Sequence, residues 1–344
     1  MENKFMEMKS FREIRGQEMA IGFLKKAISN DKIATTYLFA GIKGIGKSST
    51  ALAFALSLNC GNPVDNDGCR ECQSCRRMIN GNHPDLLIID LREKKGSIVI
   101  DQIRDINREI SFPPALDGYR VIIIKSAEKM TVEAANAFLK TLEEPPSNNI
   151  FILNAVDTGQ LLPTIISRCQ KIYFRPINER EIEDFLIHNT DVEEARAKVA
   201  ARLSEGSIGQ AKIFAQDDFI SDRIDWIKML HNVITSPFVS LFDIAQKLIN
   251  KGSPKDNRMN LMLRVWRSLY RDMLLIKYGG LQDFIINLDL KEQLEISSSA
   301  FTIDGLLQSI SIIVRAERDL MANLNVLFLM ERSLFALKRA VNSA

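Results

Sequence analysis

The sequence predicts an α/β region built on a parallel sheet, followed by an all-helical region. Short runs rich in Ile and Leu alternate with helical stretches up to residue 176, a glycine-rich loop follows the first run, and no strand-like run occurs later. Continuously apolar runs are typical of strands buried on both faces of a parallel sheet. We therefore expect five strands, at Tyr37–Ala40, Leu86–Asp90, Val121–Ile124, Ile150–Leu153 and Lys171–Phe174.

The chain is long enough for three domains. Residues 1–176 are expected to form the sheet domain. Residues 177–218 carry apolar side chains at helical spacing, as at Ile182 and Leu186, and predict a small helical domain. Residues 219–344 predict a third, helical domain, with a break at 251–254 and an apolar face that includes Val265, Trp266 and Leu269.

Composition limits the classes of function. With 344 residues, 46% apolar and 26% charged residues and a net charge of +2, the chain has an ordinary globular composition and no overall basic character for nucleic acid. The basic pairs Arg76-Arg77 and Lys94-Lys95 are expected to be solvated surface. The first residues lack a signal peptide, and no apolar run reaches the ~18 residues of a membrane span, so we expect a cytoplasmic protein that binds no membrane.

The glycine-rich loop matches the pattern GxxxxGKS, which binds phosphates. Its glycines let backbone N–H groups surround the phosphates, while Lys47 reaches the outer phosphates and Ser48 offers a hydroxyl to magnesium. An apolar strand precedes it and a helix with an apolar face follows, as this motif requires. The residues expected to bind ATP or ADP are Gly41, Ile42, Lys43, Gly44, Ile45, Gly46, Lys47, Ser48 and Ser49.

Hydrolysis also needs an acid for magnesium at the end of another strand. Two strands compete for that position. Leu86–Asp90 ends in an acid, whereas Val121–Ile124 is richer in β-branched residues but is followed by Lys125. Spacing alone does not choose between them. If the second is the catalytic strand, a cation replaces a magnesium ligand and repels the metal unless Lys125 turns toward solvent.

Four cysteines lie within sixteen residues, in the pattern C-x8-C-x2-C-x2-C. Four thiolates suit a structural zinc site with no open coordination position, which argues against a catalytic zinc. An iron–sulfur cluster is the alternative. His83 lies nearby, but it more simply forms the turn before the second strand. The expected metal ligands are Cys60, Cys69, Cys72 and Cys75.

These features together resemble one family, the bacterial clamp-loader AAA+ proteins, which include the γ/τ and δ′ subunits of DNA polymerase III. The matching segments are Gly16–Glu18, Gly41–Ser48, the four-cysteine insert, Asp101–Arg104, Ala134–Pro146 and Ser167–Cys169. The resemblance is dense over residues 1–176 and looser beyond. It implies an AAA+ P-loop domain with a zinc module, a small helical lid domain and a C-terminal helical collar domain that assembles with its counterparts.

The resemblance also decides between the two strands. Lys125-Ser126 stands where the family's ATPases carry Asp-Glu, so the acid appearance of Asp90 is accidental. The strand from Phe151 to Asp157 lacks the family's γ-phosphate-sensing threonines, and Gly209 stands where active members carry a nucleotide-contacting arginine. These losses match the δ′ pattern. They predict weak or no ATPase activity and poor magnesium binding.

Arg168 is the residue to which the resemblance assigns chemistry. The family's matching arginine reaches into the ATP site of the adjacent subunit, as a trans-acting arginine finger. Glu143 and Glu144, adjacent on a helix that Pro145-Pro146 ends, are expected to have a structural or positioning role. The implied partners are the γ/τ and δ subunits, the sliding clamp indirectly, and primer–template DNA within a heteropentamer. The alternative is a catalytically active γ/τ-type ATPase, and an adaptor without a DNA role ranks below both.

Overall fold

The computed structural model describes residues 8–92, 96–250, 258–279, 282–321 and 325–341. The chain divides into two compact units, Met1–Ile182 with Gly206–Gln210, and Glu183–Glu205 with Ala211–Ala344. The finer division into three domains, with boundaries at 176 and 218, stays a prediction. The expected break at 251–254 and the basic pair at 94–95 lie outside the described residues.

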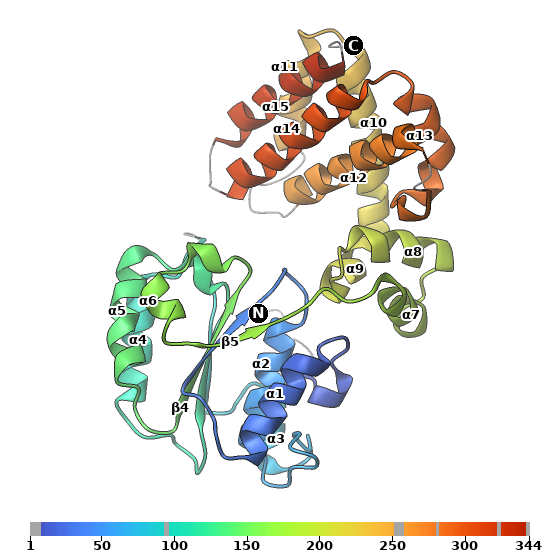
Figure 1. The fold of residues 1–344 in the computed structure, drawn as a ribbon. Coiled ribbons are helices and arrows are strands. Elements are labelled where there is room, and N and C mark those ends of the chain that lie inside the picture. Colours follow the sequence, from blue (N-terminus) through green and yellow to red (C-terminus); the bar gives the residue numbers. More distant parts are fainter. Residues whose placement is uncertain (1–7, 93–95, 251–257, 280–281, 322–324, 342–344) are drawn as a thin grey trace. The chain divides into compact units, whose positions relative to one another are not determined.

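The first unit contains a parallel sheet of five strands in the order β2-β3-β4-β1-β5 (Figure 1), which confirms the predicted fold class. The strands begin and end within two residues of the predicted limits. They are β1 (Thr36–Ala40), β2 (Leu86–Ile89), β3 (Arg120–Ile124), β4 (Asn149–Ala155) and β5 (Gln170–Tyr173). Since all five run in the same direction, the loops after β1, β3 and β4 emerge at one edge of the sheet.

Burial differs between the central and the outer strands. Every residue of β1, β3 and β4 is buried, as their continuous apolar sequences predict. In β2 each residue is only partly buried, and in β5 only Ile172 is buried. The expectation of burial on both faces therefore holds for the three central strands. It is wrong for the outer two, because each has a neighbouring strand on one side only.

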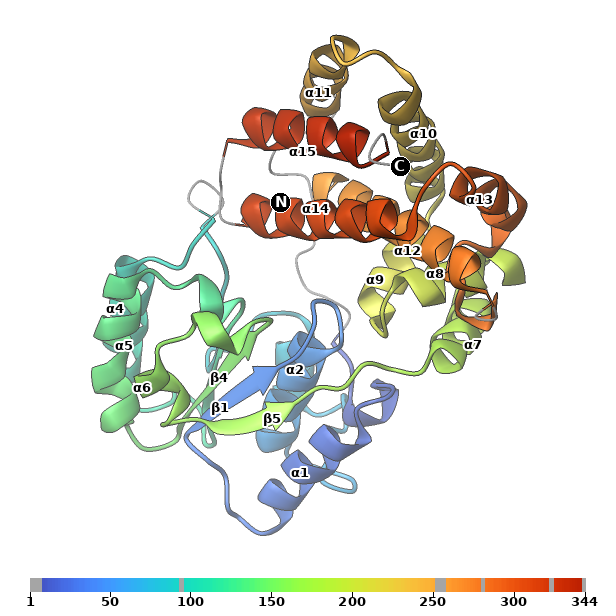
Figure 2. The same ribbon diagram turned by 45° about the horizontal axis from the view of Figure 1, so that its top comes forward.

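Helices cover both faces of the sheet (Figures 1 and 2). On one face lie α1 (Glu18–Ser29), α2 (Lys47–Leu58) and α3 (Gln73–Ile79), and on the other lie α4 (Ile100–Ile110), α5 (Val132–Glu143) and α6 (Pro163–Ile166). The α4–α5 face forms a continuous apolar core in which the rings of Phe138 and Phe151 meet edge to face, 5.4 Å apart. Short 3-10 helices lie at η1 (Phe11–Glu13), η2 (Ala127–Lys129) and η3 (Thr158–Gln160).

Local sequence explains where the two helices after β3 and β4 begin and end. Thr131 caps α5, because its hydroxyl accepts a hydrogen bond of 3.2 Å from the Ala134 N–H. Pro145 and Pro146 cannot continue the helix, which ends at Glu143. Pro163 occupies the first turn of α6, where its missing N–H has no cost.

The second unit contains helices and no strand among its described residues. Two helices, α7 (Glu179–Asn189) and α9 (Ile208–Phe214), cross from one unit into the other. The rest of this unit comprises α8 (Glu194–Leu203), α10 (Asp217–Thr235), α11 (Ser240–Asn250), α12 (Arg258–Tyr278), η4 (Gln282–Phe284), η5 (Leu288–Leu290), α13 (Lys291–Ser298), α14 (Ile303–Met321) and α15 (Val326–Val341). Trp266 anchors its core, with its indole N–H donating to the Trp226 carbonyl at 2.8 Å. The apolar face predicted around Val265–Leu269 is thus a domain core.

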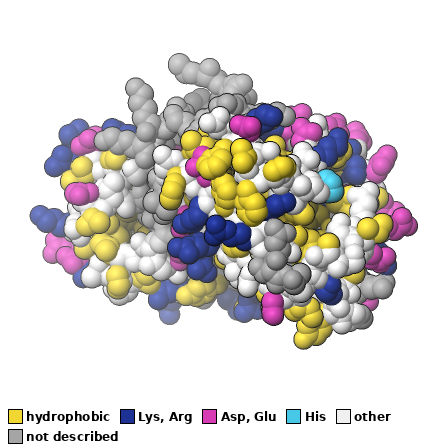
Figure 3. All heavy atoms as spheres, turned by 90° about the horizontal axis from the view of Figure 1, so that it is seen from above, with side chains coloured by type: hydrophobic (Ala, Val, Ile, Leu, Met, Phe, Trp, Pro, Cys, Tyr) yellow, Lys and Arg dark blue, Asp and Glu magenta, His cyan; other side chains and the backbone are white. Residues whose placement is uncertain are grey.

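The surface of the second unit includes an open groove of about 620 Å³. Figure 3 shows hydrophobic side chains gathered on the face of the molecule that it presents, with basic side chains beside them. The groove is lined by Phe242, Phe328 and Phe335, among others, and by the basic Arg332 and Arg339. None of the helices in the described part of the chain is both long and apolar enough to cross a membrane.

Candidate nucleotide site and metal centre

The glycine-rich loop connects the end of β1 to the start of α2. Gly44 (φ +77°) and Gly46 (φ +111°) adopt left-handed backbone conformations that favour glycine, and Gly46 is the residue at which α2 begins to turn. The Gly41 N–H donates to the Ala155 carbonyl of β4 at 3.2 Å, which fixes the start of the loop to the central sheet. The loop therefore presents the positive end of α2 at the carboxyl edge of the sheet.

The side chain of Lys47 folds back over its own loop. Its ammonium donates to the Gly41 carbonyl and, at 2.9 Å, to the Ile42 carbonyl, and only 8% of the residue is exposed. Burial lowers the pKa of Lys47 to about 8, against the charge of Glu128, which raises it. The two carbonyls thus hold the ammonium inside the loop.

The acid positions lie at unequal distances from this loop. Strands in a sheet lie about 4.8 Å apart, so β3 is about 10 Å and β2 about 14 Å from β1. Lys125, just after β3, is 28% exposed and pairs with Asp90 Oδ2 at 3.3 Å. The lysine therefore turns away from the loop toward the outer strand. Asp90 lies on the far strand and is neutralised by Lys125, so this arrangement favours β3 as the strand of the missing acid.

Glu128 is an acid near the loop that sequence reasoning missed. It lies in η2, three residues after Lys125, and its Oε2 accepts from the Val156 N–H at 3.3 Å, immediately after β4. Val156 follows Ala155, whose carbonyl binds the first residue of the glycine-rich loop. Glu128 belongs to no sequence motif. The left-handed backbone at Ser126 (φ +51°) sets the direction in which its side chain points, and this turn is not evident from the sequence.

Asn154 lies on β4, the strand in which the resemblance expects threonines. Its Nδ2 donates to the Ser48 hydroxyl oxygen at 3.2 Å, so β4 contacts the residue that the motif assigns to magnesium. Its Oδ1 is buried and has no hydrogen-bond partner among the described residues. A buried amide oxygen without a partner is costly, and a ligand or a water at this position would satisfy it.

Residues 206–210 pack directly on the tip of the loop. The Gly209 N–H donates to the Gly44 carbonyl at 3.0 Å, and the Ser207 hydroxyl donates to the Lys43 carbonyl at 2.8 Å. A Cβ at Gly209 would lie 2.8 Å from the Gly44 oxygen, which is closer than real Cβ atoms approach. Position 209, which the resemblance links to an arginine, therefore has no space for any side chain.

Arg168 lies at the opposite edge of the sheet from the glycine-rich loop. It precedes β5, whose first residue pairs with Tyr37, three residues or about 10 Å before the end of β1. Its guanidinium pairs with Glu143 Oε1 at 2.7 Å and donates to the Thr164 carbonyl at 3.0 Å, and 35% of the side chain is exposed. Glu143 therefore contacts Arg168, and its structural or positioning role stays a prediction.

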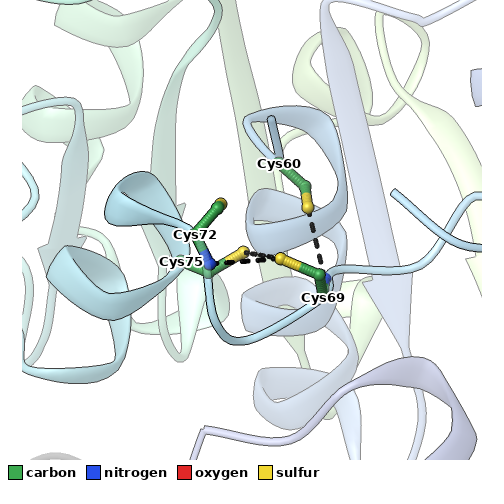
Figure 4. A group of neighbouring side chains, drawn as sticks. All are labelled: Cys60, Cys69, Cys72 and Cys75. Carbon is green, nitrogen blue, oxygen red and sulfur yellow. Dashed lines mark hydrogen bonds between the residues drawn. The ribbon is translucent and has the colours of Figure 1, made fainter. Parts of the chain in front are cut away.

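The four predicted metal ligands lie together (Figure 4). Each offers a sulfur, and these atoms all lie within 4.8 Å of one another. Tetrahedral zinc with bonds of about 2.3 Å places its sulfurs about 3.8 Å apart, and the Cys69 and Cys75 sulfurs are 3.9 Å apart. Backbone N–H groups of Cys69 and Cys72 donate to sulfur at 3.2 and 3.3 Å, which stabilises thiolates. The donor set therefore fits zinc.

Two other residues with side chains that can bind metal make different contacts. His83 is buried, bonds to the Ser74 hydroxyl through Nε2 at 3.1 Å, and accepts the Asp85 N–H through Nδ1 at 3.2 Å. Both nitrogens of its ring thus make hydrogen bonds near the turn before β2. Cys169 lies apart from the four, with its thiol against the Ile165 carbonyl at 3.1 Å, and burial raises its pKa to about 12.

A glycine-rich loop between strand and helix, at the carboxyl edge of a parallel sheet, defines a P-loop protein of the α/β class. The profile of a family described as "DNA polymerase III, delta subunit" matches residues 16–178. The DNA polymerase III subunit delta′ of Bacillus subtilis is 30% identical over 96% of this chain and 98% of its own length. The chain therefore belongs to the delta′ family of DNA polymerase III subunits.

Two further proteins are similar to this chain. The DNA polymerase III subunit tau of Bacillus subtilis is 30% identical over 90% of this chain, which spans 58% of the length of tau. A Thermotoga maritima protein described as DNA polymerase III gamma subunit-related has a TM-score of 0.44 and 19% identity, covering 94% of this chain and 99% of its own.

Proposed function

We propose that this chain is a delta′ subunit of a DNA polymerase III clamp loader, which helps to place the sliding clamp on primed DNA. The proposal rests on membership of the delta′ family over the full length of a relative. Its partners are then the γ/τ and δ subunits, with the clamp and primer–template DNA contacted within the assembly, in the cytoplasm.

The observation that carries the proposed mechanism is the separation of two half-sites. The P-loop edge has a phosphate-binding lysine but Lys125 where a magnesium acid belongs. Arg168 lies at the other edge, too far from its own P-loop to act there. We infer that Arg168 acts on the ATP site of the neighbouring subunit, where its guanidinium would stabilise the charge that develops on the transferred phosphate.

The P-loop of this chain is proposed to hold ATP or ADP without turning it over. Lys47 and the N–H groups of residues 41–49 would bind the phosphates, and Ser48 has the hydroxyl oriented by Asn154. The cysteine cluster is proposed to hold a structural zinc, which supplies folding energy and leaves no open position for chemistry.

The test compares the isolated chain with the assembled complex. The isolated chain should hydrolyse ATP at background rate. In a complex rebuilt with its partner subunits, Arg168→Ala should slow ATP-driven clamp loading by about 10³-fold, the lower range for arginine fingers. Arg108→Ala is the matched control, since Arg108 is an exposed arginine of the same unit whose ion pair among the described residues is with the exposed Asp105. Normal loading by Arg168→Ala would rule out the trans role.

A second candidate, a γ/τ-type ATPase, has one observation in its favour. Glu128 acts electrostatically on Lys47 and is held at the end of β4. An active enzyme would show magnesium-dependent turnover in the isolated chain, abolished by Glu128→Gln or by Asp90→Asn. Background turnover in the wild-type chain excludes this candidate.

A further inference from the structure

Asp67 is a buried acid that neither the P-loop nor the metal ligands use. It lies in the loop between Cys60 and Cys69, and its side chain is completely buried. Its carboxylate accepts from the Phe11 N–H at 3.0 Å, from the Arg12 N–H at 3.2 Å and from the Gly68 N–H at 2.9 Å. A buried carboxylate is stable only when several donors face it, so these contacts fix both segments together.

Two more contacts join the same segments. The guanidinium of Arg70 pairs with Glu13 Oε2 at 2.9 Å, and that of Arg12 donates to the Val64 carbonyl at 3.3 Å. Glu13 also closes the turn it belongs to, by accepting from the Ser10 N–H at 2.8 Å. The segment from Cys60 to Arg70, called the cysteine loop below, therefore holds residues 10–13 through three of its residues, Val64, Asp67 and Arg70. More than fifty residues separate the two segments in sequence.

The conformation of the cysteine loop depends on its ends. Asp65, Asn66 and Arg70 all have positive φ, at 53°, 56° and 66°, a conformation that non-glycine residues adopt at a cost. A metal bound by Cys60 and Cys69 would fix the loop on both sides of Asp67, and Cys72 and Cys75 would tie it to α3. Metal binding would thus hold Asp67 in the position from which it binds Phe11 and Arg12.

The segment that Asp67 holds leads to the edge of the P-loop. Ile14 lies beside Gly46, with its Cγ2 4.0 Å from the position of a Cβ there. Further along, the Gln17 side chain donates to the Arg175 carbonyl at 2.9 Å and accepts from the Arg175 N–H at 3.2 Å, just after β5. Residues 10–17 thus run from the cysteine loop, past the P-loop, to the end of β5.

We propose that the metal-bound cysteine module braces the border of the nucleotide site, with Asp67 as the positioning residue that transmits the effect. Zinc orders the Asp67 loop, Asp67 orders residues 10–13, and these fix Ile14 beside the P-loop. The inference rests on the zinc and nucleotide sites of the proposed function. Because linkage is reciprocal, zinc should raise the affinity for a nucleoside diphosphate by about 5-fold or more, and the nucleotide should raise that for zinc equally.

The primary test is hydrogen exchange of residues 8–17, which needs no nucleotide. In the zinc-loaded chain, Asp67→Asn should leave one equivalent of zinc bound and make the Phe11 and Arg12 amides exchange about tenfold faster, since local opening there costs less free energy. Asp65→Asn is the matched control, because Asp65 is exposed in the same loop and has none of these contacts. Removing zinc from the wild-type chain should have the same effect as Asp67→Asn, while α4 and α5 exchange unchanged.

The second arm measures ADP binding by calorimetry in the zinc-loaded variants. Asp67→Asn should weaken ADP about 5-fold, and Asp65→Asn should not. Two results would overturn the proposed role of Asp67. One is unchanged hydrogen exchange at the Phe11 and Arg12 amides in zinc-loaded Asp67→Asn, and the other is a purified wild-type chain that binds no zinc. If the wild-type chain binds no ADP, the proposed nucleotide site is wrong, and the exchange arm still decides the brace.

Discussion

The two ends of helix α2 differ in whether they carry all the side chains that their expected binding site requires. At its first residue, Lys47, the helix follows the glycine-rich loop, whose lysine donates to its own loop carbonyls, while Lys125 follows β3, where the resemblance places an acid. Just after its last residue, Leu58, comes Cys60, the first of four sulfurs gathered within bonding range of one metal. In the proposed function, the first end holds phosphate without a magnesium acid, whereas the four cysteines at the other end suit a complete structural metal site.

The largest effect is expected at the cysteine end. Cys75→Ser removes a buried predicted ligand and should abolish zinc binding. Loss of a structural metal is among the most destabilising changes that a single substitution can cause. The free energy of unfolding should therefore fall by about 4 kcal/mol or more. Thermal unfolding and metal analysis measure this. The control is Cys169→Ser, outside the cluster, which should retain zinc. Full zinc retention by Cys75→Ser would contradict the four-ligand site.

At the other end, Lys47→Ala should affect binding more than folding. The ammonium is the charged donor for phosphate, and a charge-assisted hydrogen bond contributes about 1.5–3 kcal/mol, so ADP affinity should fall by about 10- to 100-fold. Calorimetry measures the affinity, and zinc content should not change. Equal ADP affinity in Lys47→Ala would show that the loop does not bind phosphate.

A smaller effect is expected where residues 206–210 meet the loop. Gly209→Ala places a Cβ against the Gly44 oxygen and should cost about 1–3 kcal/mol in stability through overpacking. Gly22→Ala is the matched control: Gly22 lies within α1 with nothing close to its missing Cβ, so alanine there should stabilise by about 0.5–1 kcal/mol. Chemical denaturation compares the two, and equal stability of both variants would argue against the close contact.

The smallest effect concerns pH. Because the pKa of Lys47 is lowered to about 8, the ammonium is charged below that pH, and ADP affinity should decline as the pH rises through 8. Glu128 raises this pKa, so Glu128→Gln should move the decline to lower pH. Calorimetry between pH 6.5 and 9 measures the profile. An unchanged profile in Glu128→Gln would remove Glu128 from the electrostatics of the site.

The sequence predicted those features of the fold and of the candidate sites that depend on local residue patterns. The continuous apolar runs predicted all five strands, and the GxxxxGKS and cysteine spacings predicted two clusters that the structure places on the ends of one helix. Spacing could not choose between Asp90 and Lys125, whereas strand order, with β2 outermost, favours β3.

Contacts between distant segments were not predictable in this way. Asp67 binds Phe11 across 56 residues, and Ser207 binds Lys43 across 164. Neither belongs to a recognisable motif, because an aspartate in a turn and a serine beside a glycine are common. Glu128 likewise depends on a single left-handed residue, Ser126, for its direction. Partner choice for such side chains is decided by the fold, after the strands and helices have assembled.

The contact between Gly209 and Gly44 also limits how this protein can evolve. A Cβ at position 209 would meet the Gly44 backbone, so a larger side chain there needs a second change that moves one of the two segments. A single substitution is therefore poorly accommodated, which makes glycine at this position hard to replace.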